Sequence, residues 1–131
     1  MKTNDPRKRV LIESLKNGLI VSCQVQDDDP ISTPDMHVKM AEAAAWGGSV
    51  GIRANSPRQI RDIKAAVDLP VIGLYKQWHE GSNVFITPTL DAVRAVYEAG
   101  AEIIALDCTD QLTVEGRPAW ELLPKAIEAF P

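Results

Sequence analysis

The sequence is poor in cysteine and contains no long apolar run. Its two cysteines, Cys23 and Cys108, each close an apolar stretch. We therefore expect small buried thiols of a reducing compartment and not a disulfide framework. No apolar stretch approaches the roughly 20 residues that span a bilayer, and residues 1–6 carry no apolar signal core. These features predict a cytoplasmic protein that does not enter a membrane.

The sequence also has fewer basic residues than acidic ones. The chain has 14 lysines and arginines against 18 acidic residues, a net charge of -4, and its basic residues are scattered. This pattern argues against a nucleic-acid surface but leaves room for an anionic ligand in a local site. The two histidines, His37 and His79, stand alone, so no metal-ligand spacing is present and we predict no metal or cofactor. The composition is typical of one globular domain, which we place at residues 1–131.

Apolar strands and amphipathic helices alternate along the chain. After a lead-in helix at 7–16, the predicted strands are 19–24, 49–53, 71–76 and 102–107. Helices with cap and proline signals follow them, starting near Thr33-Pro34-Asp35, Ser56-Pro57, Pro88-Thr89 and Pro118. Trp46 and Trp120 lie on these helices, where we expect packing roles. Four βα units predict an α/β fold with a parallel sheet, and their pitch of about 31 residues allows half of a (β/α)₈ barrel.

Each predicted strand ends in a polar or charged residue. These residues are Gln24, Arg53, Lys76 and Asp107. Because ligands bind at the carboxyl ends of parallel strands, four such ends favour a site over four unrelated solvated residues. The alternative for Arg53 is an ordinary ion pair with Asp107, and the alternative for Lys76 is a solvated loop lysine. Lys76 is the first candidate for catalysis.

Several of these segments resemble one known family. The similar stretches are Gly18–Gln24, Gly47–Asn55, Asp68–Lys76, Val84–Thr89 and Asp107–Thr109. Their residues and order resemble the N-acetylmannosamine-6-phosphate 2-epimerases of bacterial sialic-acid catabolism. The resemblance implies a (β/α)₈ TIM barrel of the ribulose-phosphate-binding type, of which this chain would form the N-terminal half. Residues 77–83, with Trp78 and His79, depart from the family pattern.

The resemblance also implies a reaction and a role for each candidate residue. The expected enzyme is an isomerase that converts N-acyl-D-mannosamine 6-phosphate to the N-acyl-D-glucosamine epimer by removing and replacing the C2 proton beside the open-chain aldehyde. Lys76 would be the base, which requires its neutral form to be favoured by burial and by the positive charge of Arg53. Arg53, Gln24 and Asp107 would bind the sugar phosphate. The family's second acid/base and its phosphate-binding loops would lie beyond Pro131.

Two other interpretations stay open on the residues alone. A lysine at a strand end could also attack a carbonyl, as in a Schiff-base aldolase, or serve another phosphosugar isomerase. A half-barrel could instead bind a sugar phosphate without turnover, or pair with another chain. Since such a half exposes two edge strands, we expect a homo-oligomer or a partner that supplies a second half-barrel.

Overall fold

The structure is a computed structural model that describes residues 5–131. The expectation that the chain start lacks a signal core falls partly on residues 1–4, which lie outside this range. The helices are α1 Pro6–Ser14, α2 Met36–Trp46, α3 Pro57–Ala66, α4 Leu90–Glu98 and α5 Leu122–Ala129, with a 3₁₀ turn at Ala119–Glu121 before α5. The strands are β1 Ile20–Ser22, β2 Gly51–Asn55, β3 Val71–Leu74 and β4 Ile103–Ile104. Within the described residues, every helix is too short or too polar to cross a bilayer.

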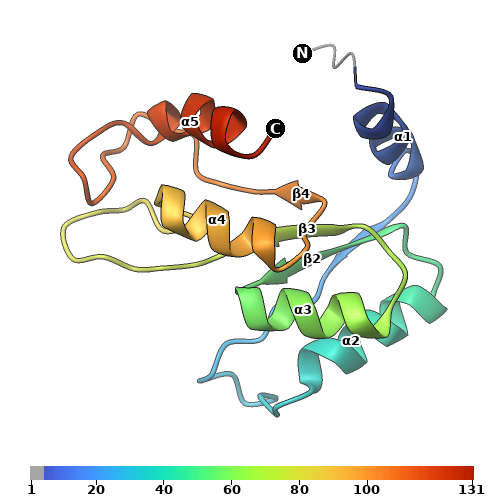
Figure 1. Cartoon of the computed structure of the whole chain (residues 1–131). Coiled ribbons are helices and arrows are strands. Elements are labelled where there is room, and N and C mark those ends of the chain that lie inside the picture. Colours follow the sequence, from blue (N-terminus) through green and yellow to red (C-terminus); the bar gives the residue numbers. More distant parts are fainter. Residues whose placement is uncertain (1–4) are drawn as a thin grey trace.

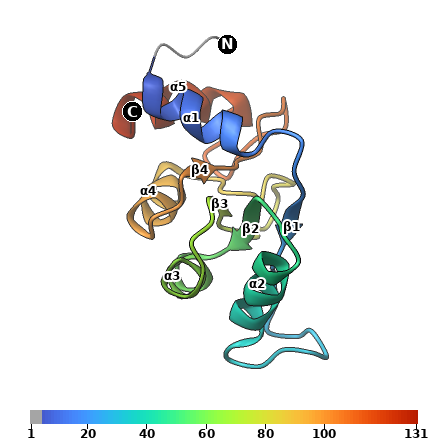
Figure 2. The same ribbon diagram turned by 90° about the vertical axis from the view of Figure 1, so that its right-hand side faces the viewer.

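The four strands form one parallel sheet in the order β1-β2-β3-β4. Each strand is followed by a helix, and α2, α3 and α4 lie along one side of the sheet (Figures 1 and 2). In Figure 2, α1 and α5 lie at the top of the view, beyond β4. The predicted fold class is therefore confirmed: four βα units with a lead-in helix form half of a (β/α)₈ barrel. In the described chain, β1 and β4 are the outer strands of the sheet.

The core lies between the sheet and the three helices. Alternate strand residues point into it, including Ile52 and Ala54 of β2, which are fully buried. Ile60 and Ile63 of α3 meet them there, and both are also fully buried. This face accounts for the apolar character of the strands, since a strand of a helix-covered parallel sheet has to fill the space beneath its helices.

Local capping chemistry fixes two of the helix starts as predicted. Ser56 Oγ accepts a hydrogen bond from the Gln59 N–H at 3.4 Å, with Pro57 in the first helical position. Thr89 Oγ1 accepts from the Ala92 N–H at 3.1 Å. The predicted start at Thr33 is wrong, because the residue before α2 is Asp35.

Three further expectations need correction. The strands β1, β3 and β4 are shorter than predicted, and β2 has the predicted length but is shifted to Gly51–Asn55, so Arg53 is not its last residue. Strand β3 ends at Leu74, because the next residues leave the parallel ladder and pair with a different segment. Cys108 is exposed, and only Cys23 is a buried thiol. Trp46 is 93% exposed and Trp120 is 47% exposed, so neither is a core residue.

Candidate active site

The sheet face opposite the core carries the candidate residue Arg53. Pairing places Ser22 opposite Arg53 and Arg53 opposite Ile72, so these three side chains share one level of that face. Ser22 is exposed and Arg53 is half-buried, in contrast to the buried Ile52 beside it. In a closed barrel this face lines the interior, where inward residues form layers. Polar residues here thus point to a ligand-facing surface.

Lys76 follows β3 by two residues and is fixed by its backbone. Its N–H donates to Asn55 Oδ1 at 2.9 Å, and it forms an antiparallel bridge with Ile86. The Lys76 side chain is half-buried and lines a cavity of about 440 Å³ at the carboxyl ends of the strands. The cavity is lined by Val25, Gln26, Asp27, Asp28, Asn55, Ser56, Gln59, Lys76 and Trp78. Lys76 is therefore a half-buried residue beside a cavity at the strand ends.

Arg53 lies deeper in the open face than Lys76. Because Arg53 pairs with Ile72, Lys76 lies four residues beyond the level of Arg53, two of them past the end of β3. The part of this spacing that lies within β3 corresponds to about 7 Å along the strand direction. The guanidinium therefore has to extend along the open face to approach the amine, and Arg53 is not among the residues that line the Lys76 cavity.

Asp107 has a clear local function. Its Oδ2 atom accepts hydrogen bonds from the N–H groups of Phe85 and Ile86, at 3.0 Å each. Its own N–H donates to the Ile86 carbonyl at 3.0 Å. Among the described ion pairs, none joins Arg53 to Asp107, so the alternative interpretation of Arg53 is wrong. Asp107 ties the segment after Lys76 to the sheet.

Gln24 follows β1, and in the described chain only the nitrogen of its side-chain amide has a hydrogen-bond partner. Its Nε2 donates to Ser22 Oγ at 2.8 Å. Its Oε1 is buried and, within residues 5–131, has no hydrogen-bond partner in the protein. A buried carbonyl oxygen without a donor costs free energy unless a ligand or water supplies one. Gln24 is thus prepared to accept a hydrogen bond from the open face.

One residue of the site was missed in the sequence. Asn55 ends β2 and holds the backbone of Lys76, and it also lines the same cavity. Its position two residues after Arg53 puts both side chains on one face of the strand, which is a signal the sequence does contain. The structure brings Lys76 and Asn55 together, whereas Gln24, Arg53 and Asp107 lie outside the lining of this cavity.

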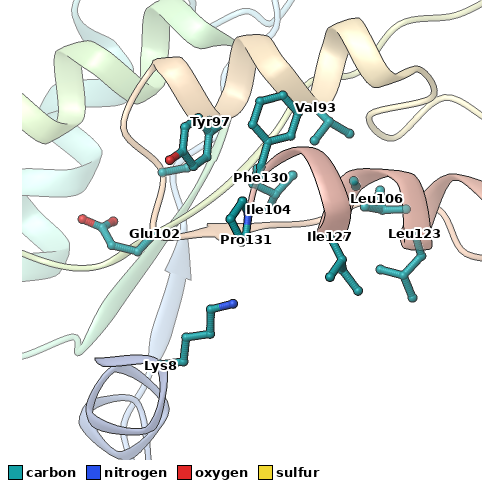
Figure 3. Close-up of a pocket in the computed structure, with 12 residues that line it drawn as sticks. Lys8, Val93, Tyr97, Glu102, Ile104, Leu106, Leu123, Ile127, Phe130 and Pro131 are labelled. Atoms are coloured by element: carbon teal, nitrogen blue, oxygen red, sulfur yellow. The ribbon is translucent and has the colours of Figure 1, made fainter. Parts of the chain in front are cut away.

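A second cavity, of about 220 Å³, lies away from Lys76 (Figure 3). It is formed mainly by apolar side chains of α4, β4 and α5, including Ile104, Leu123 and Ile127, with Lys8 reaching toward it from α1. Glu102 at its rim is already used, since it pairs with Lys64 and accepts the Val71 N–H. The cavity runs beside the outer strand β4 and lacks the convergent polar groups of a reaction site.

A metal centre is not built from the described residues. Within residues 5–131, no group of three or more His, Cys, Asp or Glu side chains is placed to hold an ion. The predicted site residues and Asn55 offer an amine, a guanidinium, two amides and a carboxylate, and the cavity lining adds the carboxylates of Asp27 and Asp28.

Comparison with known proteins relates this arrangement to one family. Residues 37–126 match the family described as "Putative N-acetylmannosamine-6-phosphate epimerase". Proteins named "Putative N-acetylmannosamine-6-phosphate 2-epimerase" are 44% identical over 121 residues in Listeria monocytogenes serotype 4a (strain HCC23) and 46% identical over 121 residues in Caldanaerobacter subterraneus subsp. tengcongensis. In both cases the match covers 92% of this chain and 51% of the relative.

A solved structure shows the same likeness in three dimensions. The N-acetylmannosamine-6-phosphate 2-epimerase from Clostridium perfringens superimposes with a TM-score of 0.84 at 33% identity, covering 98% of this chain and 56% of that one. The chain spans about half the length of the curated relatives it matches. By sequence and by fold, it belongs to the N-acetylmannosamine-6-phosphate epimerase family.

Proposed function

We propose that this chain serves the C2 epimerisation of N-acyl-D-mannosamine 6-phosphate to N-acyl-D-glucosamine 6-phosphate, with Lys76 as the base. The observation that supports this most is the fixed position of Lys76 in a cavity at the carboxyl ends of the sheet. Such an amine is held where a substrate carbon can approach it, and the family membership supplies the reaction.

The proposed step is a proton transfer beside a carbonyl. The neutral Lys76 amine takes the C2 proton of the open-chain aldehyde and becomes an ammonium. The C–H electron pair forms the C1–C2 double bond of an enolate, and its charge lies on the aldehyde oxygen. Water, or an acid on the opposite side of the substrate, then donates a proton to the opposite face of C2, which restores the aldehyde and gives the epimer. The Lys76 ammonium releases its proton to water. A positioned base typically contributes ~10²–10⁴-fold to such a step.

The other candidate residues would bind the substrate. We assign Arg53 to substrate oxygens or to the enolate, because its fork of donors and its permanent charge suit an anionic oxygen. Gln24 Oε1, which is buried and has no donor among residues 5–131, would accept from a sugar hydroxyl or from the acetamido N–H. Asp107 uses Oδ2 for the backbone of Phe85 and Ile86, which leaves Oδ1 for a hydroxyl.

We propose further that the open face is covered by a second half-barrel, from another copy or from another chain. The support is that β1 and β4 are the outer strands of the described sheet, and closure pairs such edges. We place the reaction in the cytoplasm, a compartment that suits the two free cysteines.

The proposal is tested by incubating the chain with N-acetylmannosamine 6-phosphate in D₂O and following C2 by NMR. Deuterium at C2 with formation of the glucosamine epimer is the expected result. Borohydride treatment during the same incubation tests the aldolase alternative, because only a Schiff base would trap sugar on Lys76. If prolonged incubation gives neither deuterium at C2 nor the epimer, the assignment is wrong.

A further inference from the structure

Trp78 presents an aromatic surface at the rim of the Lys76 cavity. Trp78 is 64% exposed, and its ring stacks on Phe85. The two ring centroids are 5.5 Å apart and the planes differ by 9°. Stacking of this kind adds to the contact area of each ring and fixes the orientation of the outer one. One face of the indole is thereby held against Phe85.

The segment that carries these two rings is anchored at several points. Gln77 N–H donates to the Phe85 carbonyl at 2.9 Å, next to the bridge between Lys76 and Ile86. The carboxylate of Asp107 holds the Phe85 and Ile86 amides from the sheet side. The indole is thus positioned before any ligand arrives, and contact with it requires little further loss of conformational freedom.

The cavity itself has an uneven lining. Seven of its nine lining residues have polar or charged side chains, and the two apolar ones are Val25 and Trp78. Val25 is only 5% exposed, so Trp78 is the one exposed apolar side chain in this lining. A substrate with hydroxyls, a carbonyl and one apolar group would place that group against the indole.

We propose that Trp78 binds the acyl group on the substrate nitrogen and selects N-acylated amino sugar phosphates over those with a free amine. This inference rests on the proposed function, because the acyl-bearing nitrogen is attached to C2, the carbon whose proton Lys76 removes. The acyl methyl is the one purely apolar group of the substrate. Lys76 and Trp78 line one cavity. When C2 of the substrate lies at the Lys76 amine, the acylated nitrogen on C2 therefore lies in the same cavity as the indole.

The test measures binding of two ligands by isothermal titration calorimetry. These are N-acetylmannosamine 6-phosphate and mannosamine 6-phosphate, which carries the free amine. Trp78→Ala should weaken binding of the N-acetyl compound roughly tenfold, the usual scale for losing the contact of one methyl group. Trp78→Phe should retain most of the affinity. Binding of the free amine should stay within about twofold in both variants, since the amine makes no apolar contact.

Trp46→Ala is the matched control, because Trp46 is an exposed tryptophan at the end of α2 and outside the cavity. It should leave both affinities unchanged. Equal losses for the two ligands in Trp78→Ala, no loss for either, or no binding of the N-acetyl compound to the unaltered chain would overturn the inference. C2 exchange in D₂O, measured separately at saturating substrate, reports on the proposed function. Selective binding without exchange would reject the reaction and retain the role of Trp78.

Discussion

Asn55 and Lys76 are joined across two neighbouring strands. The side-chain oxygen of Asn55 accepts the Lys76 N–H at 2.9 Å, where the parallel ladder between β2 and β3 has ended. The hydrogen bond replaces the ladder bond that Lys76 would otherwise lose. It also fixes the origin of the lysine side chain relative to the cavity, so the same contact serves the fold and the site.

Replacing Asn55 by alanine should lower both the stability of the fold and the rate of C2 exchange. Asn55→Ala leaves the half-buried Lys76 N–H without its acceptor and should lower the free energy of unfolding by about 1–2 kcal/mol. C2 exchange should fall as well, because the base is less well positioned. Asn55→Asp keeps an acceptor at the same position and should recover most of the stability in urea denaturation. An alanine variant as stable as the parent would mean that this hydrogen bond contributes nothing.

Thr87 is the second residue that anchors the end of β3. It is fully buried, its Oγ1 donates to the Ala105 carbonyl at 2.6 Å, and it accepts from the Tyr75 N–H at 3.0 Å. Thr87→Val keeps the shape and removes both bonds, so we expect a loss of about 1–3 kcal/mol in the free energy of unfolding. Thr87→Ser keeps the hydroxyl and should be clearly less damaging. If valine and serine cost the same, packing and not hydrogen bonding governs this position.

Gly73 leaves no room for a side chain beneath the helices. A Cβ atom there would lie 2.6 Å from Ala101 Cβ and 2.8 Å from Ile60 Cδ1. Gly73→Ala should therefore destabilise the protein by about 1–3 kcal/mol. Gly47→Ala is the control, because a Cβ at the end of α2 would approach nothing closer than 3.4 Å. Thermal unfolding that shows equal midpoints for the two variants would contradict this account of the core.

The two cysteines should differ in reactivity. Cys23 is fully buried, and burial raises the pKa of its thiol, so less reactive thiolate is present at any given pH. Cys108 is exposed. A disulfide reagent at pH 8 should titrate one thiol in the folded chain and two in urea. Rapid reaction of both thiols without denaturant would show that the sheet is open around Cys23.

The sequence predicts those features that local chemistry determines. Ser56-Pro57 starts a helix because the cap and the proline act within one turn. The strand order follows from the alternation of strands and helices. The predicted helix start at Thr33 was wrong, because the Thr33 hydroxyl donates to the Asp35 carboxylate and accepts no hydrogen bond from a helix N–H.

Long-range contacts set the features that the sequence did not reveal. The strand ends at Leu74 because the following residues pair with the segment around Ile86, a contact that no local pattern announces. Asp107 accepts a hydrogen bond from Phe85, which lies 22 residues earlier in the chain. The sequence showed that Asp107 is an acidic residue at a strand end, but it did not show that Phe85 is its partner. Trp46 has an apolar side chain on a regular helix, yet it is exposed, because neither the sheet nor another helix of the described chain covers its position.

The central claim is that the Lys76 amine removes the C2 proton, and the most direct measurement is the rate of C2 deuterium incorporation in Lys76→Met. Methionine keeps a long unbranched side chain and cannot accept a proton. Lys39→Met is the control, because Lys39 lies on α2 and pairs with Asp35 at 2.9 Å, away from the cavity. The account predicts exchange in the control at the parent rate and a loss of at least ~10²-fold in Lys76→Met. Exchange in Lys76→Met at the parent rate would contradict it.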